Sequence, residues 1–248
     1  ERVEKLKKIH NVFLNCYLNS SNGNNLFEDL LSNEIIDFSR YNFFYASYAV
    51  NSGNTNKALT IVNEALKLYP RNLLLNQYKL DLKQGVNISF FNCKNKRHVI
   101  AEILYITSNA LSSQSSYLLS NFYLNLAKYL NENFHSYDTL LAENFYNIDN
   151  FDEAKRIYNN LSKRGKSFKW YSSKQLAKIY IQEKNNIRAL ELVSKAYNNL
   201  ENKNIYETFD FAEFLKNNEK FRDAIPYFTK IINKVEKKHP LYAEARDG

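Results

Sequence analysis

The sequence predicts an all-α protein, a solenoid of antiparallel helix pairs stacked along the chain. Three observations predict this fold class. Gly and Pro, which turn-rich sheet folds consume, number only 5 and 3 among 248 residues. Small residues recur in pairs twelve positions apart, and the last four pairs advance by 34, 35 and 35 residues. Apolar residues follow the small residues at helical offsets of three, four and seven. Such a period is typical of helical repeat arrays.

The paired small residues mark the places where two helices of one repeat would cross. Antiparallel helices approach closely only where the side chains at the crossing are small. Asn, Asp or Gly lies between the two arms of most copies, which is typical of short turns between helices. The five pairs are Ala46 with Ala58, Ser108 with Ser120, Ala142 with Ala154, Ala177 with Ala189, and Ala212 with Ala224.

The sequence pattern of residues 1–97 predicts a divergent block that contains one regular copy of the repeat. Helices are expected at 3–18 and, more weakly, at 26–31, as a degenerate leading repeat. The regular copy covers 39–72, and a helix at 73–83 follows it without a partner helix of normal length. An irregular seam is expected near 85–97, because the step from Ala58 to Ser120 is not a multiple of the repeat length.

The sequence pattern of residues 98–248 predicts a regular array of four repeats and an incomplete C-terminal helix. The four copies run to about Lys237, and Pro240 begins a further helix that stops before it is complete. Solenoids usually end in a capping helix. We therefore expect the natural chain to continue beyond Gly248, or a partner to cover this end.

Several stretches resemble one repeat family. The run 65–72 (Ala-Leu-Lys-Leu-Tyr-Pro-Arg-Asn) resembles the ending of a tetratricopeptide repeat, and 151–154 and 221–224 resemble the start of its second helix. The resemblance covers 39–72 and 101–238 and implies a right-handed superhelical solenoid. The family's frequent Trp near the start of the first helix is absent, and its Gly at the first small position is Ala or Ser. The copies are therefore divergent.

The resemblance implies a non-catalytic scaffold or adaptor that binds a peptide or protein partner in a concave groove. Positions 2, 5, 9 and 12 of each first helix line that groove in the family, and position 2 is here Arg40, Glu102 and Ser136 in the first three copies. Tyr and Phe at such positions suit an interface. The expected partner-binding residues are Phe43, Tyr105, Asn109, Glu143, Tyr146, Tyr171, Lys174, Lys178, Phe209 and Glu213.

Three alternatives remain open. A variant of the family clamps a C-terminal carboxylate with Lys and Asn, and the nearest match is Lys174 with Lys178, without the Asn. A basic strip could bind an anionic ligand such as RNA, although its residues do not recur at one position in each repeat. The chain could also be a structural spacer in a larger assembly. The basic strip comprises Lys163, Arg164, Lys166 and Lys169.

Catalytic residues, metal ligands and cofactors are not expected, because the four His residues are scattered and no nucleotide-binding or hydrolase motif occurs. Cys16 and Cys93 form no CxxC motif; two separate buried thiols are favoured and a disulfide is possible. No run is long enough to span a membrane. The chain begins without Met, so a signal peptide would lie upstream; it would decide between the cytoplasm and the cell envelope.

Overall fold

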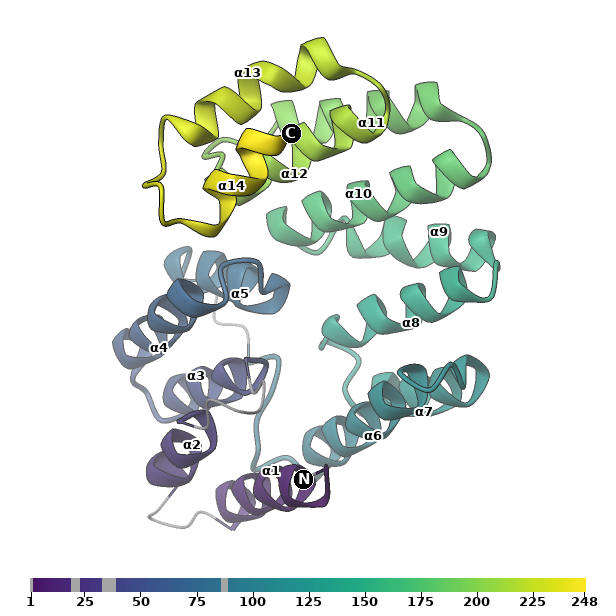
Figure 1. The fold of residues 1–248 in the computed structure, drawn as a ribbon. Coiled ribbons are helices and arrows are strands. Elements are labelled where there is room, and N and C mark those ends of the chain that lie inside the picture. The colour runs from purple at the N-terminus through teal and green to yellow at the C-terminus, as the bar shows by residue number, and fades with distance from the viewer. Residues whose placement is uncertain (1, 19–22, 33–38, 86–88) are drawn as a thin grey trace. The chain divides into compact units, whose positions relative to one another are not determined.

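A computed structural model describes residues 2–18, 23–32, 39–85 and 89–248, and this part of the chain is all-α, with fourteen helices and no strand (Figure 1). The all-α prediction is confirmed. The helices are α1 (Arg2–Tyr17), α2 (Gly23–Leu31), α3 (Tyr41–Asn51), α4 (Thr55–Leu68), α5 (Leu73–Lys83), α6 (Lys96–Ser112), α7 (Tyr117–Leu130), α8 (Ser136–Asn147), α9 (Phe151–Leu161), α10 (Lys166–Gln182), α11 (Asn186–Asn198), α12 (Ile205–Asn217), α13 (Phe221–Ile232) and α14 (Pro240–Asp247).

The chain divides into two compact units within α9. Unit 1 is Glu1–Ile157 and unit 2 is Tyr158–Gly248. The division does not fall at the seam near 85–97, of which residues 86–88 lie outside the described residues. The separation into 1–97 and 98–248 stays a prediction. It rests on the regularity of the repeats, whereas the two units are defined by how compactly the chain packs. The right-handed course of the array also stays a prediction.

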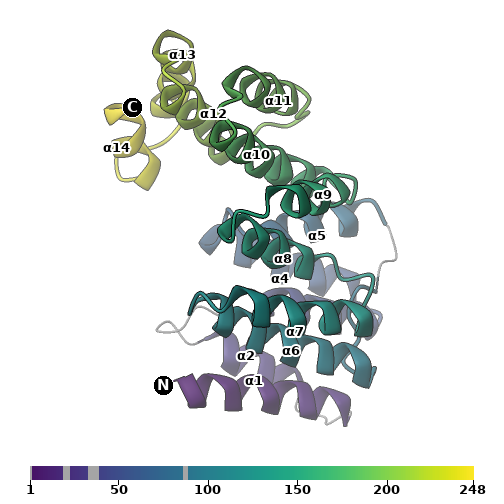
Figure 2. The same ribbon diagram turned by 90° about the vertical axis from the view of Figure 1, so that its right-hand side faces the viewer.

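The small-residue pairs are buried as the sequence predicts. All ten of these side chains are at most 1% exposed. Ser120 of α7 donates a hydrogen bond from Oγ to the carbonyl oxygen of Ser108 on α6, at 2.8 Å. The two helices therefore meet directly at this pair, and Figure 2 shows them side by side. A larger side chain at either position would push the helices apart.

The turns inside the five helix pairs share one geometry. Each contains a residue in the left-handed backbone region, with φ between 57° and 79°, five positions before the second small residue. The amide of the next residue donates back to a carbonyl near the end of the first helix, for example Asn54 to Ala49 and Asn185 to Tyr180. Only the first of these turns has Gly. The left-handed residues are Gly53, Ser115, Asp149, Lys184 and Glu219.

Asn side chains define many of the helix starts. Asn54, Asn72 and Asn185 each accept a hydrogen bond from the backbone amide three residues later, at the start of α4, α5 and α11. Asn204 does the same for α12 and forms a reciprocal capping box with Glu207. These caps satisfy backbone amides that a helix leaves free at its first turn. The abundance of Asn therefore has a structural role.

The leading helices agree with the sequence prediction in part. α1 and α5 lie where they are expected, whereas α2 begins at Gly23 rather than near residue 26. The packing around Gly23 is close, since a Cβ there would lie 2.9 Å from the Tyr48 hydroxyl oxygen. Residues 89–95 contain no helix, as expected of the seam, and α6 follows directly.

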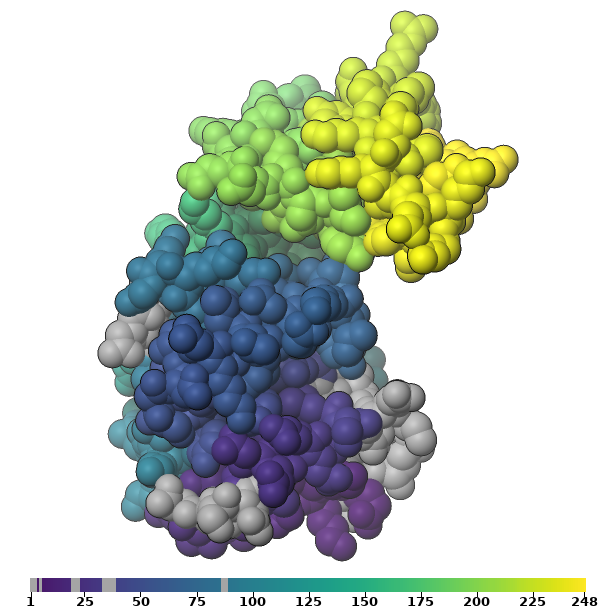
Figure 3. Space-filling view, turned by 90° about the vertical axis from the view of Figure 1, so that its left-hand side faces the viewer, coloured from purple at the N-terminus to yellow at the C-terminus, as the bar shows by residue number. Residues whose placement is uncertain are grey.

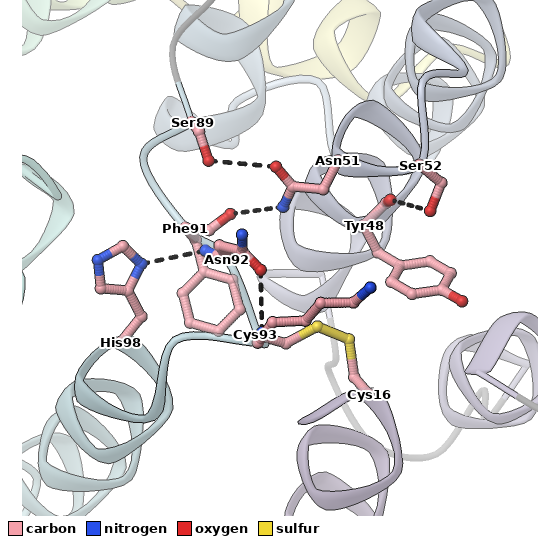
Figure 4. The surroundings of a disulfide bond; sticks show 10 residues. Cys16, Tyr48, Asn51, Ser52, Ser89, Phe91, Asn92, Cys93 and His98 are labelled. Atoms are coloured by element: carbon pink, nitrogen blue, oxygen red, sulfur yellow. Dashed lines mark hydrogen bonds between the residues drawn. A yellow bond between two sulfur atoms is a disulfide. The ribbon is translucent and has the colours of Figure 1, made fainter. Parts of the chain in front are cut away.

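A disulfide joins α1 to the seam. Cys16 and Cys93 are bonded, with Cα atoms 5.8 Å apart, a separation typical of disulfides (Figure 4). The interpretation as two separate thiols is therefore wrong, because the fold brings residues 77 positions apart into contact. Asn51 anchors the same segment by donating from its side-chain amide to the Phe91 carbonyl at 3.0 Å.

Breaking this disulfide is expected to lower the free energy of unfolding by about 2–4 kcal/mol, because the reduced unfolded chain regains the entropy of a long loop. The measurement is urea unfolding, followed by circular dichroism, with and without a thiol reductant. The control is the Cys16→Ser/Cys93→Ser variant, which should not respond to the reductant. Two titratable thiols in the denatured, unreduced chain would contradict the assignment.

None of the helices in the described part of the chain is both long enough and apolar enough to cross a membrane.

Candidate functional site

In unit 1, the face expected to form a groove is closed by contacts between its own helices. Arg40, at the N-terminus of α3, forms a two-point ion pair with Glu102 of α6, from Nε to Oε1 at 2.7 Å and from Nη2 to Oε2 at 2.9 Å. Its Nη1 also donates to Oγ of Ser136, the first residue of α8, at 2.7 Å. These are the position-2 residues of three successive copies, and they meet at one point in the interior.

The ion pair is largely shielded from water, because the Arg40 side chain is 18% exposed and that of Glu102 is 0% exposed. Glu102 is fully buried, and the guanidinium carbon of Arg40 lies 3.8 Å from the ring centre of Tyr105. Desolvation by burial on its own lowers the pKa of Arg40, but Glu102, with smaller contributions from Tyr105 and Tyr137, outweighs this effect and raises the pKa above its usual value. Burial raises the pKa of the neighbouring Tyr137 hydroxyl well above its usual value. Arg40 is therefore charged, and Tyr137 neutral, at physiological pH.

Aromatic rings surround the pair and complete the interior. Phe43 of α3 stacks on Phe134, in the turn between α7 and α8, with ring centres 5.1 Å apart. It also packs on Tyr78 of α5 at 4.7 Å. The next residue, Phe44, packs on Phe91 of the seam at 4.6 Å. The aromatic core therefore joins α3 and α5 to the seam and to the turn between α7 and α8.

Two of the predicted groove residues consequently belong to this interior. Phe43 is 0% exposed, and Tyr105 packs on Arg40 and, with ring centres 5.5 Å apart, on Tyr137. Phe43 therefore offers no surface to a partner in this structure, whereas Tyr105, which is half-buried, stays a predicted contact. The physical reason is that the N-terminus of α3 contacts α6 and α8 directly. In an open array, a ligand would occupy the space between these helices.

The other predicted groove residues of unit 1 lie farther along the helices. Asn109 is exposed on α6, and Glu143 and Tyr146 are half-buried on α8. Tyr146 packs on Phe151 of α9, with ring centres 5.7 Å apart. Below them, Asn144 donates to Ser120 and Asn121 of α7 and accepts from Ser112 of α6. Of these three residues, Glu143 lies close enough to Tyr105 to be one of the charges that raise the pKa of its hydroxyl, after burial, the largest cause.

In unit 2, the first-helix face is more accessible. On α10, Tyr171 and Lys174 are half-buried and Lys178 is exposed. On α12, Glu213 is half-buried and forms an ion pair with Lys216 at 3.1 Å. Phe209, the remaining predicted contact on α12, is only 6% exposed and packs on Phe228. Phe209 therefore stabilises the helix pair rather than presenting a surface.

Ion pairs and ring contacts connect the successive first helices of unit 2. Lys174 of α10 forms an ion pair with Asp210 of α12 and lies 5.3 Å from the ring centre of Trp170. The hydroxyl of Tyr206 lies 3.5 Å from Nε2 of His239, which precedes α14. Because Asp210 already neutralises Lys174, the structure gives no support to a carboxylate clamp made by Lys174 and Lys178.

The basic strip lies in the turn between α9 and α10 and in the first turn of α10. Lys163, Arg164 and Lys169 are exposed, and Lys166 forms an ion pair with Glu201 at 2.6 Å. Trp170, which follows the strip in sequence, is buried in the core of unit 2 and packs on Tyr197. Its indole is therefore not available to stack on a nucleic-acid base.

No group of three or more His, Cys, Asp or Glu side chains that could hold a metal ion occurs among the described residues. The expected absence of catalysis and of cofactors stays a prediction. On the sequence alone, Arg40, Glu102 and Ser136 are expected to line a groove. Opposite charges at equivalent positions of successive copies were the one signal that the positions could pair with each other.

Comparisons with known proteins give likenesses of fold. No family model and no curated protein matches the sequence. One similar solved structure is a tetratricopeptide repeat protein from Parabacteroides merdae, with 14% identity, 97% of this chain and 98% of that chain covered, and a TM-score of 0.42. Another is the apo form of the quorum sensor NprR from B. thuringiensis, with 12% identity, 99% and 80% coverage, and a TM-score of 0.47.

A third similar structure is PilF from Pseudomonas aeruginosa, with 14% identity, 84% and 96% coverage, and a TM-score of 0.37. At these identities and scores, nothing about this chain's function is taken from the matches. The fold rests on the chain's own features, namely the buried small-residue pairs and the repeated turn geometry. The protein is an all-α chain of helix pairs whose repeat resembles the tetratricopeptide repeat.

Proposed function

We propose that the protein is a non-catalytic interaction scaffold that binds a peptide or protein segment on the first-helix face of unit 2. The observation that carries the proposal is the contrast between the two units. In unit 1 this face is filled by Arg40, Glu102 and aromatic rings, whereas in unit 2 Tyr171 is half-buried and Lys178 exposed. A partner can reach the second set without unfolding the core.

The contacts between helices in unit 2 support this proposal. The ion pair between Lys174 and Asp210 fixes α10 against α12, so the side chains beside it are held in a defined arrangement. Preorganised contact residues lower the entropy cost of binding. The accessible residues Tyr171, Lys178 and Glu213 include an aromatic ring and both charges. We infer that the bound segment is an extended or helical peptide with apolar and charged residues.

The experiment is selection of peptides from a displayed library against the immobilised chain, followed by affinity measurements with variants. Tyr171→Ala and Lys178→Glu are expected to weaken the selected peptides by about tenfold each, a typical effect of an interface contact. The matched control is Lys195→Glu on α11, which makes the same charge change on an exposed second-helix residue. Equal affinity for all four proteins would reject the unit 2 face as the binding surface.

An anionic ligand such as RNA is the second candidate. All four basic-strip residues are exposed, but Glu201 offsets Lys166, and Trp170 beside the strip is buried. Binding driven by phosphates would weaken steeply with salt.

A role as a spacer remains the third candidate. The Cys16–Cys93 disulfide favours an oxidising compartment, such as the cell envelope, over the cytoplasm.

A further inference from the structure

Helix α7 exposes an apolar surface where the chain's other second helices are polar. Its exposed arc contains five large apolar side chains and one polar residue, Asn125, whose amide donates to the Asn121 carbonyl. Residues spaced by three, four and seven positions lie on one side of a helix. The five residues, here named the α7 stripe, are Leu118 (73% exposed), Leu119 (49%), Phe122 (57%), Leu126 (38%) and Tyr129 (68%).

The repeat provides an internal comparison for the α7 stripe. Ser120 is equivalent to Ala58 of α4 and Ala189 of α11, so the same offsets identify equivalent outward positions. Figure 3 shows the side of unit 1 on which α4 lies. The equivalent residues are Asn56, Lys57, Thr60, Glu64 and Lys67 on α4, and Ile187, Arg188, Glu191, Lys195 and Asn198 on α11. Nine of these ten residues are polar, so neither the fold nor the helix pairing requires the α7 stripe to be apolar.

Few acidic side chains lie next to the α7 stripe along the chain, and the exposed Glu132 just after α7 is one of them. From Leu82 to Asn131 the chain has a single acidic residue, Glu102, which is buried against Arg40. Exposed cations lie just before α6, at Lys94, and in its first turn, at Lys96 and Arg97. Lys128 of α7 is offset by Asp138. This surface is therefore apolar at its centre and positive at one end.

The cations are adjacent to the α7 stripe itself. The guanidinium of Arg97 donates to the Tyr129 carbonyl at 3.0 Å and lies 5.5 Å from the centre of its ring. Tyr129 is the last residue of the stripe, so the positive segment 94–97 begins where the apolar arc ends. Figure 2 shows α6 and α7 packed side by side in unit 1.

We propose that the α7 stripe is a docking surface for an anionic lipid membrane, with α7 lying in the plane of the interface. An exposed arc of Leu, Phe and Tyr beside Lys and Arg is the pattern of helices that insert their apolar face below lipid headgroups. Basic residues next to it are attracted by anionic lipids. A second copy of the chain fits less well, because its stripe has no acidic side chain and only Glu132 beside it could meet the three cations at Lys94, Lys96 and Arg97.

The test is flotation of the full chain with vesicles, comparing pure phosphatidylcholine with phosphatidylcholine and phosphatidylglycerol in an about two-to-one ratio. The stripe variant is Leu119→Arg/Phe122→Glu/Leu126→Lys, which places the α11 residues at the equivalent positions of α7. It adds net positive charge, so a purely electrostatic attraction would be preserved or strengthened. The matched control is Ile187→Ser, which removes an exposed apolar residue from the equivalent face of α11.

Wild type and Ile187→Ser are expected to bind the anionic vesicles, and to bind them more weakly at high salt. The partition coefficient of the stripe variant on the same vesicles should be at least about tenfold lower than that of wild type. Lys94→Gln/Lys96→Gln should weaken binding to anionic vesicles only. Circular dichroism of the stripe variant should match wild type, because the exchanged residues are exposed. Binding by the stripe variant equal to wild type, or no binding of wild type to either vesicle, would overturn the proposal. Loss of a wild-type dimer in light scattering, without vesicle binding, would assign the α7 stripe to a second copy instead.

Discussion

Replacing Glu102 with alanine is expected to lower the free energy of unfolding by about 3–5 kcal/mol, because it leaves the buried charge of Arg40 without a partner. Arg40 would also lose two of its three hydrogen bonds and keep only the bond to Ser136. Water replaces the lost bonds poorly, because the Arg40 side chain is only 18% exposed. Urea unfolding followed by circular dichroism measures the change.

Two further variants separate the charge from the packing. Glu102→Gln keeps the shape and one acceptor, so its loss should be smaller than that of Glu102→Ala. Arg40→Leu/Glu102→Leu removes both charges and should be more stable than Glu102→Ala, since replacing a whole buried pair is far less costly than breaking it. If the double variant were instead the least stable, the pair itself would be a net stabiliser.

A surface pair gives the control for this prediction. Glu64 and Lys67 of α4 are 2.7 Å apart, with most of both side chains exposed. Glu64→Ala should therefore change the free energy of unfolding by no more than about 1 kcal/mol. Equal losses for Glu102→Ala and Glu64→Ala would mean that the Arg40 pair is not buried in solution as it is in the structure.

The local features of the fold follow from the sequence because each depends on a few neighbouring residues. A small residue at a helix crossing is required by the distance between the helices, so Ala46 and Ala58 identify their helix pair without any knowledge of the rest. The turn geometry likewise recurs at one offset, whether the residue is Gly53 or Glu219. The small-residue pair and the turn each occur five times along the chain, so the sequence pattern that produces them can be recognised.

The closed interior of unit 1 could not be predicted in the same way. Arg40 and Glu102 are 62 positions apart, and the irregular segment between α5 and α6 decides whether their helices face each other. The same segment brings Cys93 to Cys16. The family resemblance assumes a continuous array in which these positions face solvent. The resemblance therefore predicts Phe43 and Tyr105 on a groove, whereas Phe43 lies in the aromatic core and Tyr105 lies against Arg40.

Phe43→Ala is expected to lower the free energy of unfolding by about 3–5 kcal/mol, the usual cost of removing a buried aromatic ring from a packed core. Phe43 is 0% exposed and contacts the rings of Phe44, Tyr78 and Phe134, so three elements lose packing at once. Urea unfolding followed by circular dichroism measures the loss.

The control is Phe122→Ala on α7, which removes the same ring from a site that is 57% exposed and should change stability by about 0.5 kcal/mol or less. Similar losses for the two variants would place Phe43 at the surface and reopen the groove assignment. The distinction matters for mapping a partner. Weaker binding by Phe43→Ala would follow from a disrupted core, whereas weaker binding by Tyr171→Ala at unchanged stability would identify a contact.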